Sequence, residues 1–393
     1  MKNRILTSIV CLFSGFVNGV LAQNYSPIDS LPLFDGSRYF TFVNTQNYKN
    51  DTLLAFSYPK LDLSFINGQG KFLSKITQKG EGPGLLGTAA FIDVAVGQDR
   101  DIYVMSIENT FTLFVYNPQG KYKGHVRLFN SLPGANAQAF YSSFNVVDDL
   151  QRKGYVILTM SIGSSLYSPY SEEYYEKGAQ IAQFRINKQT LKVESTEKKV
   201  LLRNEPEIKE ALTKNSMSWY RGTALFDFNN DKFYKATMYS RKIDVYDRSF
   251  NKIREIELTK LPRLRNNFST RFSPKRSTDI MVRTTLDQRL QYENVSVWNV
   301  QSQGDILLVQ LNQPVEAGRH KVPTLKEMQS GWSASYPSLV LIKNLKTNTE
   351  KLFSLDSRFQ GKITLIDAEH FLIQGSPSPD VEETYLYKFR IGL

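Results

Sequence analysis

Cysteine is almost absent from the sequence, because the 393 residues contain only one, Cys11. It lies inside an apolar run near the N-terminus, so a chain cleaved after that run would have no cysteine at all. This scarcity excludes a disulfide framework, a thiolate nucleophile and a cysteine-ligated metal from the remainder of the chain. The hydrophobic core must then hold the protein together, which suits a large, closed sheet architecture.

Long hydrophobic runs are also missing after residue 22. The early run, residues 5–22, follows Lys2 and Arg4 and ends in Val20-Leu21-Ala22. A basic start, a short apolar region and small residues at the end are typical of a secretory signal, and the polar and glycine residues within the run make a retained anchor the weaker alternative. We therefore expect a signal peptide over residues 1–22, cleaved near Ala22, and a mature chain without a transmembrane segment in the periplasm or at the cell surface.

Histidine is scarce as well, with three isolated residues, His125, His320 and His370. No two of them have the spacing of metal ligands, so no metal site is expected. The segment Gly80–Gly84 lacks the Lys-Ser/Thr ending and the following helix of a phosphate loop, and Asp227–Asp231 lacks the glycine of a calcium loop. We predict no cofactor, and we interpret the first segment as a crossing between two sheets and the second as a hairpin turn.

Acidic residues are outnumbered, with 38 Asp and Glu against 49 Lys and Arg and a formal net charge of +11. A basic excess can indicate binding to nucleic acid, to an anionic surface or to an acidic polysaccharide. For an exported protein nucleic acid is the poorest of these partners, and we expect none to be bound. A glycan or an envelope protein remains as the partner, alongside the alternative that the charge serves solubility.

Aromatic residues, by contrast, are plentiful, with 25 Phe and 21 Tyr, and this favours sheet over helix. Residues 78–128 show the clearest pattern, in which four short apolar-aromatic runs follow the glycine-rich segment and are separated by turn residues. They are Phe91–Val96, Ile102–Ser106, Thr112–Tyr116 and Tyr122–Leu128. Strands this short, joined by small loops, predict a four-stranded antiparallel meander, the unit of a β-propeller blade.

The same pattern recurs five times along the chain. The further predicted strands are Tyr39–Val43, Thr52–Ser57, Leu61–Ile66 and Lys71–Thr77; Phe144–Val147, Tyr155–Ser161, Gln180–Ile186 and Val193–Leu202; Thr223–Phe228, Lys232–Met238, Lys242–Tyr246 and Lys252–Leu258; Asn294–Val300, Asp305–Leu311, Ser338–Lys343 and Thr349–Leu355; and Lys362–Ile366, His370–Gln374 and Tyr385–Ile391. The last set lacks a fourth strand. The N-terminal segment Ser26–Phe34 is the candidate that completes this set and closes the ring.

The turns between the third and fourth strands support this count. Each turn begins with Asn or Asp, whose side chain accepts hydrogen bonds within a turn; these residues are Asn67, Asn117, Asn187, Asp247 and Asn344. Blade periods are usually about 40 to 50 residues, and the longer intervals here contain identifiable loops. The sequence predicts an all-β fold, with residues 23–393 forming a single domain, a six-bladed β-propeller of four-stranded antiparallel blades. Seven blades are the alternative, because the last of these intervals has room for one more.

Three of these segments together resemble a known group of proteins: Gly80–Gly84, Ile102–Ser106 and Leu113–Lys121. They are similar to the secreted six-bladed β-propellers of the Bacteroidetes in the TolB-like or NHL-like group, many of which have no known function. The likeness is sharpest over residues 60–130 and becomes general blade patterning elsewhere. The resemblance implies the six-bladed fold and a location in the cell envelope, and it brings no catalytic residues with it.

Three long insertions contain the candidate binding residues. Residues 164–177 are rich in tyrosine, residues 260–289 are rich in arginine, and residues 314–336 combine basic and aromatic side chains. Long loops on a rigid scaffold are where binding usually occurs, and aromatic rings with cationic donors suit an acidic glycan. The candidate ligand-binding residues are Tyr170, Tyr174, Arg271, Arg319 and Trp332. In the alternative interpretation, the tyrosines pack the loops and the arginines are solvated.

Two functions fit these observations. The favoured hypothesis is a non-catalytic binding or scaffolding module in the cell envelope, whose ligand is a glycan or an envelope protein. The alternative is a propeller enzyme, a glycan lyase or hydrolase, whose active site lies at the central channel and draws residues from several blades. No catalytic residues are predicted.

Overall fold

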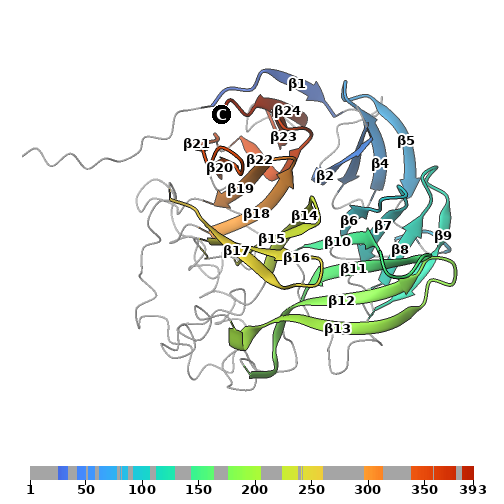
Figure 1. Cartoon of the computed structure of the whole chain (residues 1–393). Helices are drawn as coiled ribbons and strands as arrows, with labels where there is room; N and C mark the ends of the chain where they lie inside the picture. The colour runs from blue at the N-terminus through green and yellow to red at the C-terminus, as the bar shows by residue number, and fades with distance from the viewer. Residues whose placement is uncertain are drawn as a thin grey trace, which may run out of the picture.

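The chain forms a ring of six β-sheets (Figure 1). The structure, a computed structural model, describes residues 25–33, 42–49, 52–57, 62–77, 80, 82–86, 92–106, 112–128, 143–162, 176–204, 224–237, 240, 242–259, 296–312, 338–356, 358–377 and 383–393. Within these residues every sheet is antiparallel and has four strands. The prediction of an all-β, six-bladed propeller is confirmed. Residues 1–22 lie outside the described residues, so the signal peptide and its cleavage near Ala22 stay predictions.

Blades 1 to 3 follow one another along the chain, and each begins with its innermost strand. Blade 1 contains β2 (Phe42–Lys49), β3 (Thr52–Ser57), β4 (Asp62–Asn67) and β5 (Phe72–Thr77). Blade 2 contains β6 (Ile92–Val96), β7 (Ile102–Ser106), β8 (Thr112–Tyr116) and β9 (Tyr122–Arg127). Blade 3 contains β10 (Phe144–Asp148), β11 (Tyr155–Ser161), β12 (Ala179–Asn187) and β13 (Val193–Leu201), and the short 3-10 helix η2 (Leu202–Asn204) follows it.

Blades 4 and 5 repeat this order, and blade 6 combines the two ends of the chain. Blade 4 contains β14 (Ala224–Asn229), β15 (Lys232–Thr237), β16 (Lys242–Asp247) and β17 (Lys252–Glu257). Blade 5 contains β18 (Ser296–Gln303), β19 (Ile306–Asn312), β20 (Ser338–Asn344) and β21 (Glu350–Ser354). Blade 6 contains β22 (Phe359–Leu365), β23 (His370–Gly375), β24 (Tyr385–Arg390) and, as its outermost strand, β1 (Asp29–Pro32).

The strand β1 closes the ring, as the sequence predicts for Ser26–Phe34. It pairs antiparallel with β24, and backbone hydrogen bonds from Ile28 N to Lys388 O (2.8 Å) and from Leu33 N to Thr384 O (2.9 Å) extend the pairing at both ends. The side chain of Leu33 is fully buried in the core between blades 6 and 1. The two ends of the chain therefore share one sheet, and the last blade gains the strand that its own sequence lacks.

Polar side chains on the innermost strands join neighbouring blades at the centre of the ring. The amide of Asn47 on β2 donates to the carbonyl of Ile366 after β22 (2.8 Å), and Asn299 on β18 donates to the carbonyl of Ile363 (2.9 Å). In the opposite sense, the side chain of Gln301 accepts from Leu365 N at 2.6 Å. An innermost strand has one edge without a partner strand, and these side chains pair the backbone groups that this edge exposes.

This arrangement explains the one strand whose predicted end was wrong by more than three residues. The sequence predicts a strand over Tyr39–Val43, whereas β2 continues to Lys49 through the polar stretch Asn44–Lys49. Such a run of consecutive polar residues does not resemble a buried strand. It is accommodated because Thr45 and Asn47 hydrogen-bond to blade 6 and Gln46 bonds to the carbonyl of Val94 in blade 2.

The alternative of seven blades is wrong. Each described innermost strand contacts the next one around the whole ring, in the order β2, β6, β10, β14, β18, β22 and back to β2. In particular, β14 of blade 4 lies directly against β18 of blade 5, which flank the longest interval in the sequence. No further blade fits between them.

The repeated Asn or Asp turns are confirmed in all five predicted positions. In each, the side-chain oxygen Oδ1 accepts hydrogen bonds from two backbone amides that follow it. For Asn117 the donors are Gln119 N (3.0 Å) and Lys121 N (2.8 Å). The side chain thus replaces the missing backbone partner of a tight turn, which is why this residue type recurs.

The glycine-rich segment lies between β5 of blade 1 and β6 of blade 2, as predicted for a crossing. The carbonyl of Gly84 accepts hydrogen bonds from the hydroxyls of Thr77 (2.5 Å) and Tyr116 (2.7 Å). Gly84 has φ +80°, and a Cβ at this position would lie 2.9 Å from Cβ of Tyr122. Close contact with blade 2 therefore requires glycine here.

Candidate functional site

The candidate residues chosen from the long insertions all lie outside the described residues. They are Tyr170, Tyr174, Arg271, Arg319 and Trp332. Their role in binding stays a prediction, and the site below consists of residues that the sequence did not single out.

The described interfaces between blades are apolar, with one exception. Five of the six contain a buried cluster of aliphatic and aromatic side chains from both blades. Between blades 3 and 4 the buried apolar cluster of the described residues is small, and Ile181 is the only described residue of blade 3 in its fully buried part, where it packs with Phe226 and Phe233 of blade 4. The face of blade 3 that meets blade 4 is therefore the unusual surface of this ring.

A row of polar side chains crosses that face of blade 3. Asn145, Thr159, Gln183 and Glu197 are paired in register across β10, β11, β12 and β13. Residues that are opposite one another in neighbouring strands point to the same side of a sheet, as do alternate residues along one strand. Gln183 is two residues from Ile181, so the whole row points towards blade 4.

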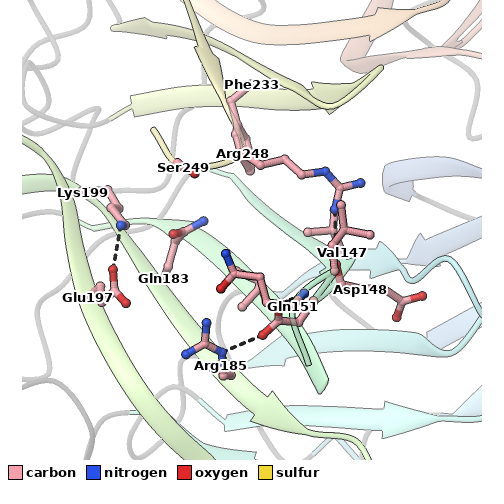
Figure 2. A pocket seen from close by; sticks show the side chains of 13 residues that line it. Val147, Asp148, Gln151, Gln183, Arg185, Glu197, Lys199, Phe233, Arg248 and Ser249 are labelled. Carbon is pink, nitrogen blue, oxygen red and sulfur yellow. Dashed lines mark hydrogen bonds and ion pairs between the residues drawn. The ribbon is translucent and has the colours of Figure 1, made fainter. Parts of the chain in front are cut away.

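A cavity of about 400 Å³ lies beside this row (Figure 2). Its walls come from β10 to β13 and the β10–β11 turn of blade 3, and from β15 and the β16–β17 turn of blade 4. The lining residues are Val147, Asp148, Asp149, Leu150, Gln151, Ile157, Gln183, Arg185, Glu197, Lys199, Phe233, Arg248 and Ser249. The volume is within the range of small-molecule binding sites, about 300–1,000 Å³.

Two ion pairs within blade 3 fix the charged groups of the cavity. Nε of Arg185 lies 2.7 Å from Oδ2 of Asp149, and Nζ of Lys199 lies 2.7 Å from Oε2 of Glu197. Burial acts to raise the pKa of Asp149, but hydrogen bonds from the amide of Gln151 and from Arg185, with the charge of Arg185, hold the pKa below its usual value. The hydrogen bond from Lys199 similarly lowers the pKa of Glu197. Both carboxylates are therefore ionised at neutral pH.

Blade 4 places a third cation on the opposite wall. Arg248 follows β16, and its Nε and Nη2 donate to Oδ1 of Asp231 at 2.8 and 2.5 Å. Its Nη1 reaches the backbone carbonyl of Asp148 in blade 3 at 3.3 Å, and the guanidinium carbon lies 5.2 Å from the centre of the Phe228 ring. Arg248 is thus held in place at the boundary of the two blades.

The amide of Gln183 is oriented by the strand beside it. Its Nε2 donates to the hydroxyl of Thr159 at 3.1 Å, while among the described residues its oxygen accepts no hydrogen bond. Phe233, on the facing wall, packs against Phe228 and Phe250 with ring centroids 4.7 and 4.5 Å away. The cavity therefore combines a fixed hydrogen-bonding wall on blade 3 with a rigid aromatic wall on blade 4.

The histidines and the acidic segment considered as possible metal sites have structural roles in the part of the chain that the structure describes. Nδ1 of His125 lies 2.9 Å from the hydroxyl of Tyr122, and His370 pairs with Asp367 at 3.0 Å. Asp227–Asp231 forms the β14–β15 hairpin, whose turn residues Asn230 and Asp231 have φ of 49° and 60°. In the described part of the chain, no three His, Cys, Asp or Glu side chains are placed to hold a metal ion.

Similarity to solved structures agrees with this architecture. The sequence matches no protein-family profile and no curated protein. The fold is similar to that of a member of the DUF4221 family from Bacteroides vulgatus, with a TM-score of 0.60 and 11% identity over 93% of this chain and 97% of that one. It is also similar to a candidate exported protein from Bacteroides fragilis, with a TM-score of 0.53 and 12% identity over 92% and 94% of the two chains. At such identities the likeness concerns the propeller fold alone.

Among the described residues, no helix has the length and apolar character needed to cross a membrane.

Proposed function

We propose that this protein is an exported, non-catalytic propeller that binds a glycan of the cell envelope in the cavity between blades 3 and 4. The observation that supports this most is the polar row on the face of blade 3 that meets blade 4. At the other described interfaces, neighbouring blades pack apolar side chains against each other. Buried polar groups lower stability unless they are paired. This row runs from the buried Thr159 to the exposed Glu197, and such a row beside an open cavity is expected where a ligand, and not the neighbouring blade, completes the contacts.

Export is supported by the basic start, the apolar run and the small residues up to Ala22. The likeness to a candidate exported Bacteroides protein, and the resemblance to secreted propellers of the TolB-like or NHL-like group, agree with it. A protein recovered from the cell envelope should then begin at Gln23, which intact-mass measurement and N-terminal sequencing would test. A mature chain that still begins at Met1 would contradict export by a cleaved signal.

The enzymatic alternative, a glycan lyase or hydrolase at the central channel, has less support. Three amide side chains of the innermost strands, those of Asn47, Asn299 and Gln301, hydrogen-bond to the backbone of neighbouring blades, whereas Asp93 on β6 lies 3.8 Å from Nζ of Lys362 on β22. The three amides serve ring closure, and none of them is an acid, a base or a nucleophile.

Blocking the cavity tests the binding function. Ser249 is an exposed turn residue that lines the cavity, and Gln119 occupies the equivalent turn position of blade 2, away from it. The mature chain should bind to one or more glycans of an array. Ser249→Trp should weaken that binding at least about tenfold, and Gln119→Trp should leave it unchanged. No retention by the mature chain, or equal retention by both variants, would contradict the proposal.

A further inference from the structure

The charges that line the cavity balance one another. Three cations, Arg185, Lys199 and Arg248, face three carboxylates, those of Asp148, Asp149 and Glu197. Moreover, each cation already has a carboxylate partner within 2.8 Å: Asp149 for Arg185, Glu197 for Lys199, and Asp231 for Arg248. Asp148 is paired in turn with Lys188 at 2.5 Å. The net charge of the whole chain is therefore a poor guide to this site.

From this balance we infer that the cavity recognises a neutral, hydroxylated sugar and not an acidic glycan. The inference rests on the proposed function and names its ligand class. A hydroxyl group both donates and accepts hydrogen bonds, so it can bridge a carboxylate and a neighbouring cation without breaking their pair. A uronate or a sulfate would have to displace a carboxylate from its cation and then lie close to the carboxylates that remain.

The arrangement of the polar groups also fits a sugar ring. Gln183 and Glu197 are opposite one another on adjacent strands, and Gln183 and Arg185 alternate along β12. In a sheet these separations are about 4.8 Å and about 6.7 Å, respectively. The strands thus space these hydrogen-bonding residues at intervals comparable to those between hydroxyls on one or two linked sugar rings, with Phe233 as an apolar wall for the carbon-bound hydrogens.

An extended peptide fits this surface less well. Peptides that add to a sheet pair with the free backbone edge of a strand. The cavity is lined by the face of blade 3, where the backbone groups of β12 are already paired with β11 on one side and β13 on the other. On β12 only side chains remain to recognise a ligand, and these present both donors and acceptors.

A change of charge inside the cavity tests the inference. Glu197→Gln removes the partner of Lys199 and leaves the cavity with an excess positive charge, while Gln keeps a similar shape. Glu255→Gln is a matched control, because Glu255 pairs with Lys242 (2.9 Å) and Lys252 (2.5 Å) on blade 4 and does not line the cavity. The ligands are a neutral oligosaccharide retained on the array and a uronate-containing oligosaccharide of the same length, each titrated by calorimetry.

We expect the wild-type chain to bind the neutral oligosaccharide more tightly than the uronate, with an affinity that changes less than about threefold between low and high salt. Glu197→Gln should shift the ratio of the two affinities towards the uronate by about tenfold, and Glu255→Gln should not. Preference of the wild type for the uronate with a steep salt dependence, or an unchanged ratio in Glu197→Gln, would overturn the inference. If only acidic glycans bind and Ser249→Trp blocks them, the proposed function stands and this inference fails; if no glycan binds, both fail.

Discussion

Asp227 and Ser302 join the innermost strands of blades 4 and 5 through one carboxylate oxygen. Oδ2 of Asp227 accepts hydrogen bonds from the backbone amide of Ser302 at 2.6 Å and from its hydroxyl at 3.0 Å. Burial between the blades raises the pKa of Asp227 to about 6, against hydrogen bonds that act to lower it. A carboxyl group therefore contributes to ring closure in a form whose charge depends on pH.

The first prediction concerns this pH dependence. In the unfolded chain Asp227 titrates near 3.8, so between about pH 4 and 6 the folded protein holds a proton that the unfolded chain has lost. The contribution of Asp227 to the free energy of unfolding is then largest below about pH 4 and falls as the pH rises to 6. Asp227→Asn keeps an acceptor for Ser302 and removes the titration.

The variant should match the wild type near pH 4 and be more stable above pH 6. The full shift would correspond to about 3 kcal/mol, and the partial exposure of Asp227 should make the gain smaller. Urea unfolding of both proteins from pH 4 to pH 8 would measure it. A stability difference that does not vary with pH would contradict the raised pKa.

Closure of the ring by β1 gives the second prediction. Replacing the buried Leu33 with Ala should lower the free energy of unfolding by about 3 kcal/mol, because it removes apolar contacts with blades 6 and 1 and leaves a cavity. Ile28, which precedes β1 and is 56% exposed, is the control, and Ile28→Ala should cost less than about 0.5 kcal/mol. Equal effects of the two changes in thermal or denaturant unfolding would show that β1 does not close the ring.

The repeated turns give the third prediction. Asn117→Ala removes the acceptor of two backbone amides and should destabilise the protein by about 1–2 kcal/mol. Asn117→Asp keeps a side-chain oxygen at the same position and should remain close to the wild type. Denaturant unfolding compares the two, and a loss of similar size in both variants would mean that the amide group of Asn117, and not its oxygen, stabilises the turn.

The fold was predictable because its signals are local. Apolar alternation marks most strands, and a single Asn or Asp such as Asn187 marks the turn between the third and fourth strands of a blade. The polar stretch of β2 was missed because its side chains bond to other blades, Asn47 to blade 6 and Gln46 to blade 2, and such long-range partners leave no local pattern.

The cavity was not predictable in the same way. Gln183 and Arg185 alternate with buried apolar residues along β12, which is the ordinary pattern of a strand with one solvated face. Only the three-dimensional arrangement shows that this face meets blade 4. A comparison of third strands contains a partial signal, since the corresponding strand β20 of blade 5, Ser338–Asn344, has four consecutive apolar residues where β12 alternates.

The most direct test of the account is a crystal structure of the mature chain with the neutral oligosaccharide that the array selects. The account predicts electron density for a sugar ring between blades 3 and 4, with its hydroxyls within hydrogen-bond distance of Gln183 and of the Arg185–Asp149 pair and its carbon face towards Phe233. Density at any other place, such as beside Tyr170 or Trp332, with this cavity free of sugar, would contradict it.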